Sequence, residues 1–514
     1  MGHRDFVHFY VNGKEHRVGG AAVFQTLSDY LRQDLYLCGT KVVCAEGDCG
    51  ACSVLVLDRQ RSQAPVTGSG SAYKAVNACI QYLYQIDGAH IVTVEGLKAQ
   101  NAINAVQSAM VDQNGAQCGY CTPGFITTMC ALAQDMQAGV SACGSKDKYK
   151  DKTTCIKDAL TGNLCRCTGY EAIIQAGLAI DLDTFQPVAD LYDLASIDES
   201  LQSTRQQSVS IQAAQRLVFV PADLDSALGF LAGQPGARIV SGGTDVSVNI
   251  NKRGLLPDVI LSTCLLSKND ATLTAITLDT ASNTVIIGAL TSLKNVEAFF
   301  AEHVPEFARV LWVFGSPQIR NAGTLAGNIA NGSPIGDSLP FLFVAGATID
   351  VASQARGRRS VAIDAFYKGY KQLDLAPDEL IVGIRVPLTQ EILRLYKVSR
   401  RQHLDISGFT AAFALSLEPT AMGAVPVIKK LRVALGGVAA TVLRMRQIED
   451  RAVGMTHDAT TWAILGEMAR SAIDPLSDVR GARDYRLTLA RNIFDKFYLE
   501  TSETGTAPRE PICK

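Results

Sequence analysis

Eight of the fourteen cysteines fall into two groups with different spacing, and this restricts the fold more than any other feature of the 514-residue chain. The first group is Cys44-x4-Cys49-x2-Cys52 followed by Cys79, and the second is Cys118-x2-Cys121 followed by Cys165-x-Cys167. The first spacing is that of plant-type [2Fe–2S] sites, in which four thiolates hold two bridged irons. We therefore predict two binuclear iron–sulfur sites with these eight cysteines as ligands.

Small residues fill the first cysteine group. Gly47, Gly50 and Ala51 would let the backbone wrap tightly around inorganic sulfides and direct amide N–H groups at the negative charge of a cluster. The alternatives are a zinc knuckle or unrelated buried thiols. Zinc sites usually use two short Cys-x2–4-Cys pairs, whereas here three cysteines lie close together and the fourth is distant, so the spacing favours a cluster.

The second cysteine group is predicted to lie at two helix starts. Thr122-Pro123 follows Cys121 and Thr168-Gly169 follows Cys167, which predicts Thr122 and Thr168 as N-caps and Pro123 at the first helical position. The partial positive charge of a helix N-terminus lowers thiol pKa values and stabilises an anionic cluster. Zinc is again the alternative, but Cys-x-Cys is tighter than zinc ligation normally uses.

Composition and the N-terminal sequence indicate the environment. The 48 Lys and Arg residues balance 50 Asp and Glu residues, so charge gives no case for nucleic-acid binding. No apolar leader and no run of 18 apolar residues is present, which predicts a cytoplasmic protein without a membrane contact. Disulfides are disfavoured in that reducing compartment. The other cysteines are predicted to be free thiols: Cys38, Cys130, Cys143, Cys155, Cys264 and Cys513.

Hydrophobic periodicity divides the chain into several domains, as the length also suggests. A hairpin with an Asn12-Gly13 turn indicates a β-grasp, ferredoxin-like domain in residues 1–88. The predicted parts that follow are an all-helical, four-helix domain at 89–182, a linker at 183–210, an α/β domain at 211–388 and an α+β subdomain at 389–514, with an exposed polar insertion at 143–157. The predicted fold class is multidomain α+β.

Two glycine-rich turns in the α/β region indicate a dinucleotide. The first is Arg-Ile-Val-Ser-Gly-Gly-Thr-Asp at 238–245, and the second extends over 320–337. Such turns bring backbone N–H groups close to a pyrophosphate, but neither fits the Rossmann fingerprint and no Walker A motif is present. Close packing alone would also explain each turn. Two one-electron carriers combined with a dinucleotide site favour a flavin, which collects single electrons and releases a hydride.

The cysteine motifs resemble those of a known family. The chain is similar over nearly its whole length to the small, iron–sulfur/flavin subunit of bacterial xanthine dehydrogenases, in the molybdenum hydroxylase family. The resemblance lies in Gly39-Thr-Lys41, residues 44–52, the Gln117 to Gly124 segment and the Gly162 to Tyr170 segment. It departs from the family at Val42-Val43 and at Glu171. The resemblance implies an FAD-binding domain of the vanillyl-alcohol-oxidase type.

The resemblance also implies a set of FAD-binding residues. Those on the diphosphate are Ile239, Val240, Ser241, Gly242, Gly243, Thr244 and Asp245; Phe314 lies against the isoalloxazine ring; Thr324, Gly327, Asn328 and Asp337 contact polar parts; and Ile381 and Lys397 lie near the ring or the adenine end. The loop from Ser399 to Asp405 would lie near the flavin, where the family admits NAD. A solvated surface loop is the alternative.

The function implied by the resemblance is electron transfer. The sequence contains no molybdopterin-binding region, so the molybdenum cofactor is expected on a partner large subunit that oxidises hypoxanthine or xanthine, in a dimer of heterodimers. Electrons would pass through the helical-domain cluster, then the ferredoxin-like cluster, to FAD and NAD, with no catalytic side chain in this chain. The alternatives are a related hydroxylase acting on an aldehyde, CO or an aromatic acyl thioester, and a stand-alone electron carrier. Many related hydroxylases split the iron–sulfur and flavin parts into separate chains, which favours the purine branch.

Overall fold

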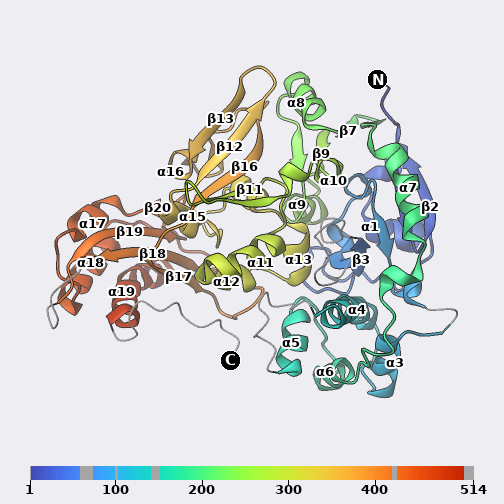
Figure 1. Ribbon diagram of the computed structural model, residues 1–514, viewed down its shortest axis with the longest axis horizontal. Coiled ribbons are helices and arrows are strands. Elements are labelled where there is room, and N and C mark those ends of the chain that lie inside the picture. The colour runs from blue at the N-terminus through green and yellow to red at the C-terminus, as the bar shows by residue number, and fades with distance from the viewer. Residues whose placement is uncertain (1, 58–72, 99–101, 140–150, 419–424, 503–514) are drawn as a thin grey trace.

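The computed structural model describes residues 2–57, 73–98, 102–139, 151–418 and 425–502. Figure 1 shows the chain as adjoining α/β and helical parts, with the N-terminal sheet at one end and the C-terminal subdomain at the other. The fold class is the predicted multidomain α+β. None of the helices in the described ranges is both long and apolar enough to cross a membrane.

The N-terminal domain is a five-stranded sheet with strand order β2-β1-β5-β3-β4. Its first two strands form the predicted hairpin, and Asn12 and Gly13 have the positive φ angles, 50° and 78°, that the turn requires. The strands are β1 (Phe6–Val11), β2 (Lys14–Gly19), β3 (Ser53–Leu57), β4 (Tyr73–Asn77) and β5 (His90–Val92), and the short helix α1 covers Leu27–Asp29. The sheet therefore includes a strand beyond residue 88, where the sequence placed the end of this domain.

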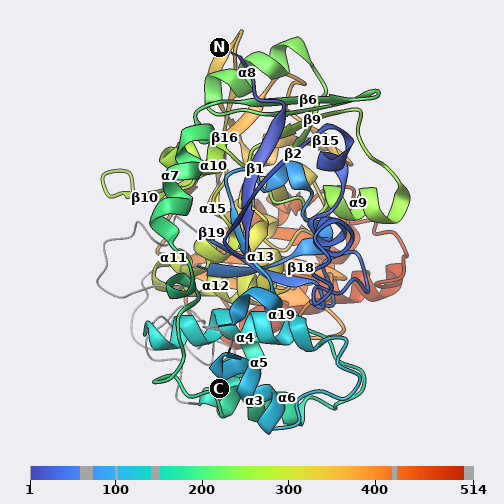
Figure 2. The same cartoon turned by 90° about the vertical axis from the view of Figure 1, so that its right-hand side faces the viewer.

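Four helices form the second domain, as predicted, and Figure 2 shows them packed below the first sheet. They are α3 (Ala105–Asp112), α4 (Thr122–Gln137), α5 (Lys152–Ala159) and α6 (Glu171–Leu178). The prediction of an exposed insertion at 143–157 is wrong for its second half. Cys155 and Ile156 of α5 are buried in the domain core, and residues 143–150, with Cys143, lie outside the described residues.

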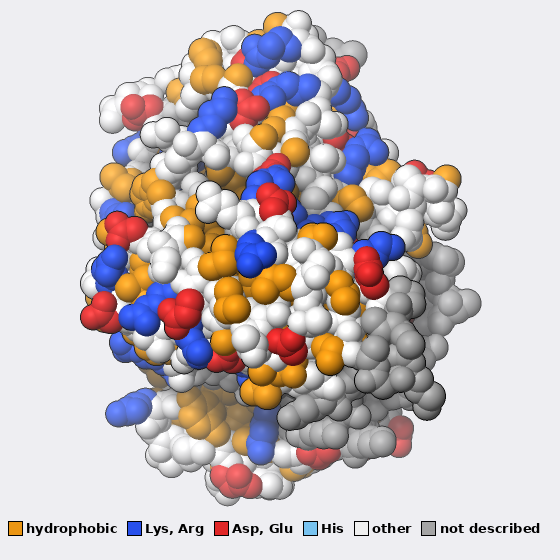
Figure 3. All heavy atoms as spheres, turned by 90° about the vertical axis from the view of Figure 1, so that its left-hand side faces the viewer, with side chains coloured by type: hydrophobic (Ala, Val, Ile, Leu, Met, Phe, Trp, Pro, Cys, Tyr) orange, Lys and Arg blue, Asp and Glu red, His pale blue; other side chains and the backbone are white. Residues whose placement is uncertain are grey.

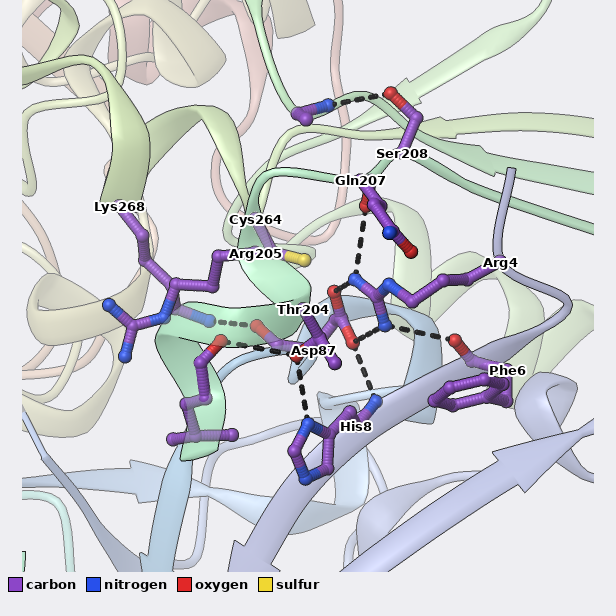
Figure 4. Close-up of polar contacts among 12 residues, drawn as sticks. Arg4, Phe6, His8, Asp87, Thr204, Arg205, Gln207, Ser208, Cys264 and Lys268 are labelled. Atoms are coloured by element: carbon purple, nitrogen blue, oxygen red, sulfur yellow. Dashed lines mark hydrogen bonds and ion pairs between the residues drawn. The ribbon is translucent and has the colours of Figure 1, made fainter. Parts of the chain in front are cut away.

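The prediction of a linker at 183–210 needs correction, because this segment contains the 12-residue helix α7 (Leu194–Arg205). Figure 4 shows the charged contacts beside this helix. The carboxylate of Asp87, which is fully buried, accepts two hydrogen bonds from Arg4 at 3.1 and 2.8 Å and one from the backbone N–H of His8 at 2.6 Å. The His8 ring contacts Thr204 of α7, and Lys268 of the α/β region donates to the Asp87 carbonyl. These contacts attach α7 and the α/β region to the first domain.

The α/β region contains two larger sheets, with strand orders β6-β7-β9-β8 and β10-β11-β16-β12-β13, and a small sheet of β14 and β15. Its strands are β6 (Val209–Ala213), β7 (Arg216–Val220), β8 (Arg238–Val240), β9 (Val259–Ser262), β10 (Ile276–Asp279), β11 (Thr284–Gly288), β12 (Thr348–Ser353), β13 (Gly357–Ala362), β14 (Tyr367–Gly369), β15 (Gln372–Leu373) and β16 (Leu380–Pro387). Its helices are α8 (Leu224–Gly233), α9 (Val246–Arg253), α10 (Leu266–Asn269), α11 (Leu293–His303), α12 (Pro305–Trp312), α13 (Pro317–Ala322), α14 (Leu325–Asn331), α15 (Leu339–Ala345) and α16 (Ile363–Phe366).

The C-terminal subdomain packs three helices against a four-stranded antiparallel sheet. Its elements are β17 (Ile392–Val398), β18 (Phe409–Leu417), β19 (Ile428–Gly436), β20 (Leu443–Arg444), α17 (Arg446–Ala452), α18 (Ala459–Ser471) and α19 (Arg483–Ser502). The aromatic rings of Phe413, Trp462 and Phe497 meet in its core. Acidic and basic side chains are interspersed over the face in Figure 3, in keeping with the balanced composition.

Candidate functional site

The first cysteine group comes together at one edge of the N-terminal sheet. Cys52 and Cys79 are buried, while Cys44 and Cys49 are half-buried. Hydrogen bonds with the thiols of Cys49 and Cys79 hold the pKa of Cys44 well below its usual range. Hydrogen bonds with Cys44 and Cys52 raise the pKa of Cys79. All four thiols are therefore linked in one chain of contacts, although Cys79 is 27 residues beyond Cys52 in the sequence.

The loop around these thiols contains the expected small residues. Gly47 and Gly50 have positive φ angles of 79° and 66°, which glycine adopts without strain. One backbone N–H, that of Asp48, is directed at the Cys44 sulfur at 3.4 Å. A Cβ on Gly50 would lie 2.2 Å from the carbonyl oxygen of Gly162, so this glycine also lets the helical domain approach the loop.

The second cysteine group meets at the surface of the helical domain. The Cys167 sulfur lies 3.8 Å from that of Cys165 and 3.7 Å from that of Cys118. Burial raises the pKa of Cys121 to about 12. Burial acts in the same direction on Cys165, but hydrogen bonds with Thr168 outweigh it and lower the pKa of Cys165 to about 7. Cys118 and Cys167 are exposed, so this site opens to solvent.

The predicted N-caps at this site are wrong. The N-cap of α4 is Cys121, so Thr122 is already the first helical residue, and the N-cap of α6 is Tyr170 at a φ of 71°. The Thr168 hydroxyl accepts a hydrogen bond from the Tyr170 N–H at 3.2 Å and contacts the Cys165 sulfur at 3.0 Å. Thr168 therefore acts on a thiol directly and does not cap the helix.

The donor set of each site suits the predicted clusters. The twelve cysteines in the described ranges are free, and each site has four of them. Within those ranges, no group of three or more His, Cys, Asp or Glu side chains is arranged to hold a metal ion. Four thiolates suit either zinc or an iron–sulfur cluster. The assignment to [2Fe–2S] clusters therefore depends on the ligand spacing.

A cavity of about 220 Å³ lies between the two sheets of the α/β region, and most of the predicted FAD residues line it. The predicted residues in its wall are Ile239, Ser241, Gly242, Gly243, Thr244, Asp245, Phe314, Thr324, Gly327, Asn328 and Ile381. The wall combines the accessible backbone of the glycine-rich turns with apolar side chains. That combination suits a cofactor with a diphosphate and a flat ring.

Three predicted FAD residues do not line the cavity. Val240 is buried beneath it. Asp337 and Lys397 form a buried ion pair with an oxygen–nitrogen distance of 2.6 Å, and the Ser407 hydroxyl donates to the same carboxylate at 2.5 Å. Lys397 instead lines a neighbouring cavity of about 320 Å³ with other cations of the described chain, namely Arg309, Arg400, Arg401 and Lys496.

Several residues in the cavity wall were not predicted from the sequence. They include Arg238, Thr263, Leu290, Leu293, Gly323, Ala326, Asn331 and Leu380. Most come from strand ends and helix starts that lie far apart in the chain, and most are apolar. Four of them, Arg238, Gly323, Ala326 and Asn331, stand inside the two glycine-rich segments and were open to detection. The sequence signal of the others is that of ordinary core residues.

Hydrogen bonds connect the three predicted cofactor sites. The N–H of Leu164, the neighbour of Cys165, donates to the Cys49 carbonyl at 2.9 Å. On the other side of the first site, Gln81 donates to the carbonyl of Gly242 at 3.1 Å. Asn251 of α9 donates to the carbonyl of Cys79 at 2.8 Å. The first cysteine site is thus joined by hydrogen bonds both to the second site and to the flavin cavity.

These features define an iron–sulfur flavoprotein with two cysteine sites and one dinucleotide cavity. Four family models match the chain in succession: a 2Fe-2S iron-sulfur cluster binding domain at residues 9–83, a [2Fe-2S] binding domain at 93–178, an FAD binding domain in molybdopterin dehydrogenase at 209–389, and a CO dehydrogenase flavoprotein C-terminal domain at 394–501. The chain therefore carries two iron–sulfur domains, an FAD-binding domain and a flavoprotein C-terminal domain.

Curated relatives and a solved structure extend this similarity. The chain is 28% identical over 555 residues to the xanthine dehydrogenase of Drosophila subobscura and 27% identical over 560 residues to xanthine dehydrogenase 1 of Arabidopsis thaliana. Each alignment covers 96% of this chain and 39% of the relative, so the chain spans about two fifths of their length. A chain of quinoline 2-oxidoreductase from Pseudomonas putida 86 is 28% identical with a TM-score of 0.50, over 56% of this chain and 97% of that one.

Proposed function

We propose that this chain is the electron-transfer part of a xanthine or hypoxanthine dehydrogenase. Electrons come from a molybdenum-cofactor partner chain and pass from the Cys118 site to the Cys44 site and on to FAD, which reduces NAD. The xanthine dehydrogenase relatives, matched along 96% of the chain, support the purine substrate. The side chains of this chain hold and orient the cofactors, which supply the redox chemistry.

One observation carries this proposal: direct hydrogen bonds join the first cysteine site to the second site and to the flavin cavity. Leu164 connects the Cys165 segment to Cys49, and Gln81 connects the Cys79 segment to the turn at Gly242. A chain that only stored iron or bound a nucleotide would not need this connection between the sites. Electron transfer does need it, because redox centres exchange electrons rapidly only when they are held close together.

The exposure of the second cysteine site supports a partner chain. Cys118 and Cys167 are exposed, and so are the apolar side chains that precede the other two cysteines in the sequence: Tyr120 is 45% exposed and Leu164 is 43% exposed. Val43, on the neighbouring cysteine loop, is 60% exposed. Contiguous exposed apolar groups mark interaction sites. We propose this face as the contact with the molybdenum-cofactor subunit, in a dimer of heterodimers in the cytoplasm.

A cavity lined by cations supports NAD as the electron acceptor. The 320 Å³ cavity beside Lys397 contains Arg400 and Arg401 of the predicted loop 399–405, together with Arg309 and Lys496. Clustered cations suit the phosphates of a dinucleotide. Arg401 is paired with Asp405 at 2.5 Å, which orders the loop at the cavity mouth.

A second candidate function is the same electron transfer in a hydroxylase for another substrate. The quinoline 2-oxidoreductase chain, with its identity of 28%, supports this candidate as well as the relatives support the first. The two candidates differ in the substrate of the partner chain. Copurification of a molybdenum-containing chain, followed by assays with xanthine, hypoxanthine, quinoline and an aldehyde, separates them.

The replacement Cys121→Ser tests the cluster assignment. We expect it to remove one of two [2Fe–2S] signals in electron paramagnetic resonance and to uncouple substrate oxidation from NAD reduction, because a ligand of the second site is lost. The matched control is Cys130→Ala, which changes a buried cysteine on the same helix that is not a predicted ligand. If Cys121→Ser retains both signals, the ligand assignment is wrong. If the unaltered protein contains zinc in place of iron, the whole proposal fails.

A further inference from the structure

A fully buried glutamine joins three of the domains. Gln318 lies on α13, in the α/β region, and its side-chain Nε2 points at three oxygens: Asn163 Oδ1 at 2.9 Å, Thr128 Oγ1 at 3.2 Å and Ser53 Oγ at 3.3 Å. Ser53 directly follows Cys52 of the first site. Asn163 and Thr128 belong to the helical domain, and Asn163 is two residues before Cys165. We call these four side chains the three-domain contact.

The partners of Gln318 are themselves held in place. Asn163 donates to the Gly50 carbonyl at 3.2 Å, which directs its own oxygen at Gln318. Ser53 donates to the same carbonyl at 2.7 Å, so its oxygen remains free to accept. Thr128 and Ser53 are 4% and 3% exposed. These oxygens are buried away from water, so leaving one of them without a hydrogen bond would lower the stability of the folded state. The amide of Gln318 supplies the donor that they share.

The main chain at Gly162 is shaped for this glutamine. A Cβ on Gly162 would lie 2.0 Å from Gln318 Oε1 and 2.7 Å from Ser316 Cβ. Only a glycine therefore lets the second cysteine segment approach α13 this closely. Gly162 stands at the start of the Cys165 motif without being a cluster ligand, and this contact explains its place there.

The helix that carries Gln318 is rigidly connected to the flavin cavity. Phe314 precedes α13 and Gly323 follows it, and both line the cavity. Arg320 of the same helix donates to the carbonyls of Phe314 and Gly315 at 3.1 Å and forms a buried ion pair with Glu297 at 2.9 Å. A shift of α13 would therefore displace the cavity wall relative to both cysteine sites.

We propose that Gln318 is a positioning residue for electron transfer, which holds both cluster domains and the flavin wall at fixed separations. This inference rests on the proposed function and adds to it a residue that touches no cofactor. One amide group donates to all three oxygens, so the loss of this group would weaken all three domain contacts at once. Each cofactor site would keep its own ligands.

The test uses the full chain loaded with iron–sulfur clusters and FAD, with the replacements Gln318→Met and Gly162→Ala. Methionine at position 318 keeps the length of the side chain but cannot donate a hydrogen bond. Alanine at position 162 leaves Gln318 itself unchanged, but its methyl group would displace the Gln318 amide. After one-electron reduction by pulse radiolysis, we expect the equilibration between clusters and flavin to be about 10-fold slower or more, since small misplacements of reacting groups have large effects on rate. The magnetic coupling between the two reduced clusters should change as well. Gln175→Met, on an exposed face of α6, is the control and should change neither quantity.

The outcomes separate this inference from the proposed function. Retention of both cluster signals and of FAD, with slower equilibration in either variant, supports the role of Gln318. Unchanged equilibration and coupling in both variants overturn it, and so does the loss of one cluster signal from Gln318→Met with normal behaviour of Gly162→Ala. If the unaltered chain shows two cluster signals but no transfer to the flavin, the proposed function fails and this inference fails with it.

Discussion

The replacement Gly242→Ala tests whether the glycine-rich turn at 238–245 shapes the flavin cavity. The turn packs against the end of α13, and a Cβ on Gly242 would lie 2.0 Å from the Ala322 carbonyl oxygen and 2.9 Å from the Gly323 nitrogen. Cβ atoms essentially never approach another heavy atom closer than 3.0 Å, so the methyl group requires a displacement of at least 1 Å between two backbone segments. Both segments line the cavity, and neither is a flexible side-chain end.

The expected magnitude follows from this overlap. Inserting a methyl group where backbone must move costs about 1–3 kcal/mol. If the cavity wall moves to relieve the strain, FAD binding is weakened by this free energy, and the dissociation constant of FAD rises roughly 5- to 150-fold. Where it is not relieved, it lowers the free energy of unfolding by a similar amount. The two losses together should fall within this range.

The assay is a titration of the FAD-depleted chain with FAD, followed by flavin fluorescence, combined with urea denaturation of the same samples. The matched control is Gly233→Ala at the end of α8, where a Cβ would have no neighbour within 4 Å. An alanine there should leave FAD affinity unchanged and leave stability equal or slightly higher. If Gly242→Ala binds FAD within twofold of the unaltered chain and unfolds at the same urea concentration, the assignment of this turn to the flavin cavity is wrong.

Two further predictions concern stability. Asp87→Asn should lower the free energy of unfolding by about 3–5 kcal/mol, because the buried guanidinium of Arg4 loses its counter-charge. The exposed control Asp112→Asn should change the free energy of unfolding by less than about 0.5 kcal/mol. Equal effects of the two replacements would refute this reasoning. Burial lowers the pKa of His457, whose Nδ1 accepts a hydrogen bond from Trp462 at 2.9 Å. The folded state therefore resists protonation, so stability is complete above the ordinary pKa of 6.5 and falls as the pH drops below it. Urea denaturation of His457→Gln across that range should show a smaller loss, and an identical pH dependence would contradict the prediction.

The sequence alone determined the features that depend on neighbouring residues. The Cys44 to Cys52 spacing places three thiols within one loop, and Asn12-Gly13 supplies the positive φ angles of a hairpin turn. Apolar residues at helical spacing predicted the helices around Phe125 and Ile173. In each case the determining interactions connect residues a few positions apart, so a linear pattern records them.

Other features were decided by competition with distant groups. Thr168 has the local sequence of an N-cap, but its hydroxyl instead contacts the Cys165 sulfur. Few apolar residues mark the segment 183–210, yet it contains α7, which buries Ile197 and Leu201. The polar insertion likewise contains α5, because Cys155 and Ile156 find a place in the helical core. Local propensity predicts poorly where tertiary packing supplies the stabilising contacts.

Only the tertiary structure decided how the three cofactor sites are connected. The partners of Gln318 lie 155, 190 and 265 positions away in the chain, and Asn251 reaches the Cys79 carbonyl across 172 positions. A buried amide takes its role from the unpaired oxygens that the fold brings to it, and nothing in the neighbouring sequence specifies those oxygens. The ligands of each site can thus be predicted from a one-dimensional pattern, whereas the separation between sites depends on how the domains pack against one another.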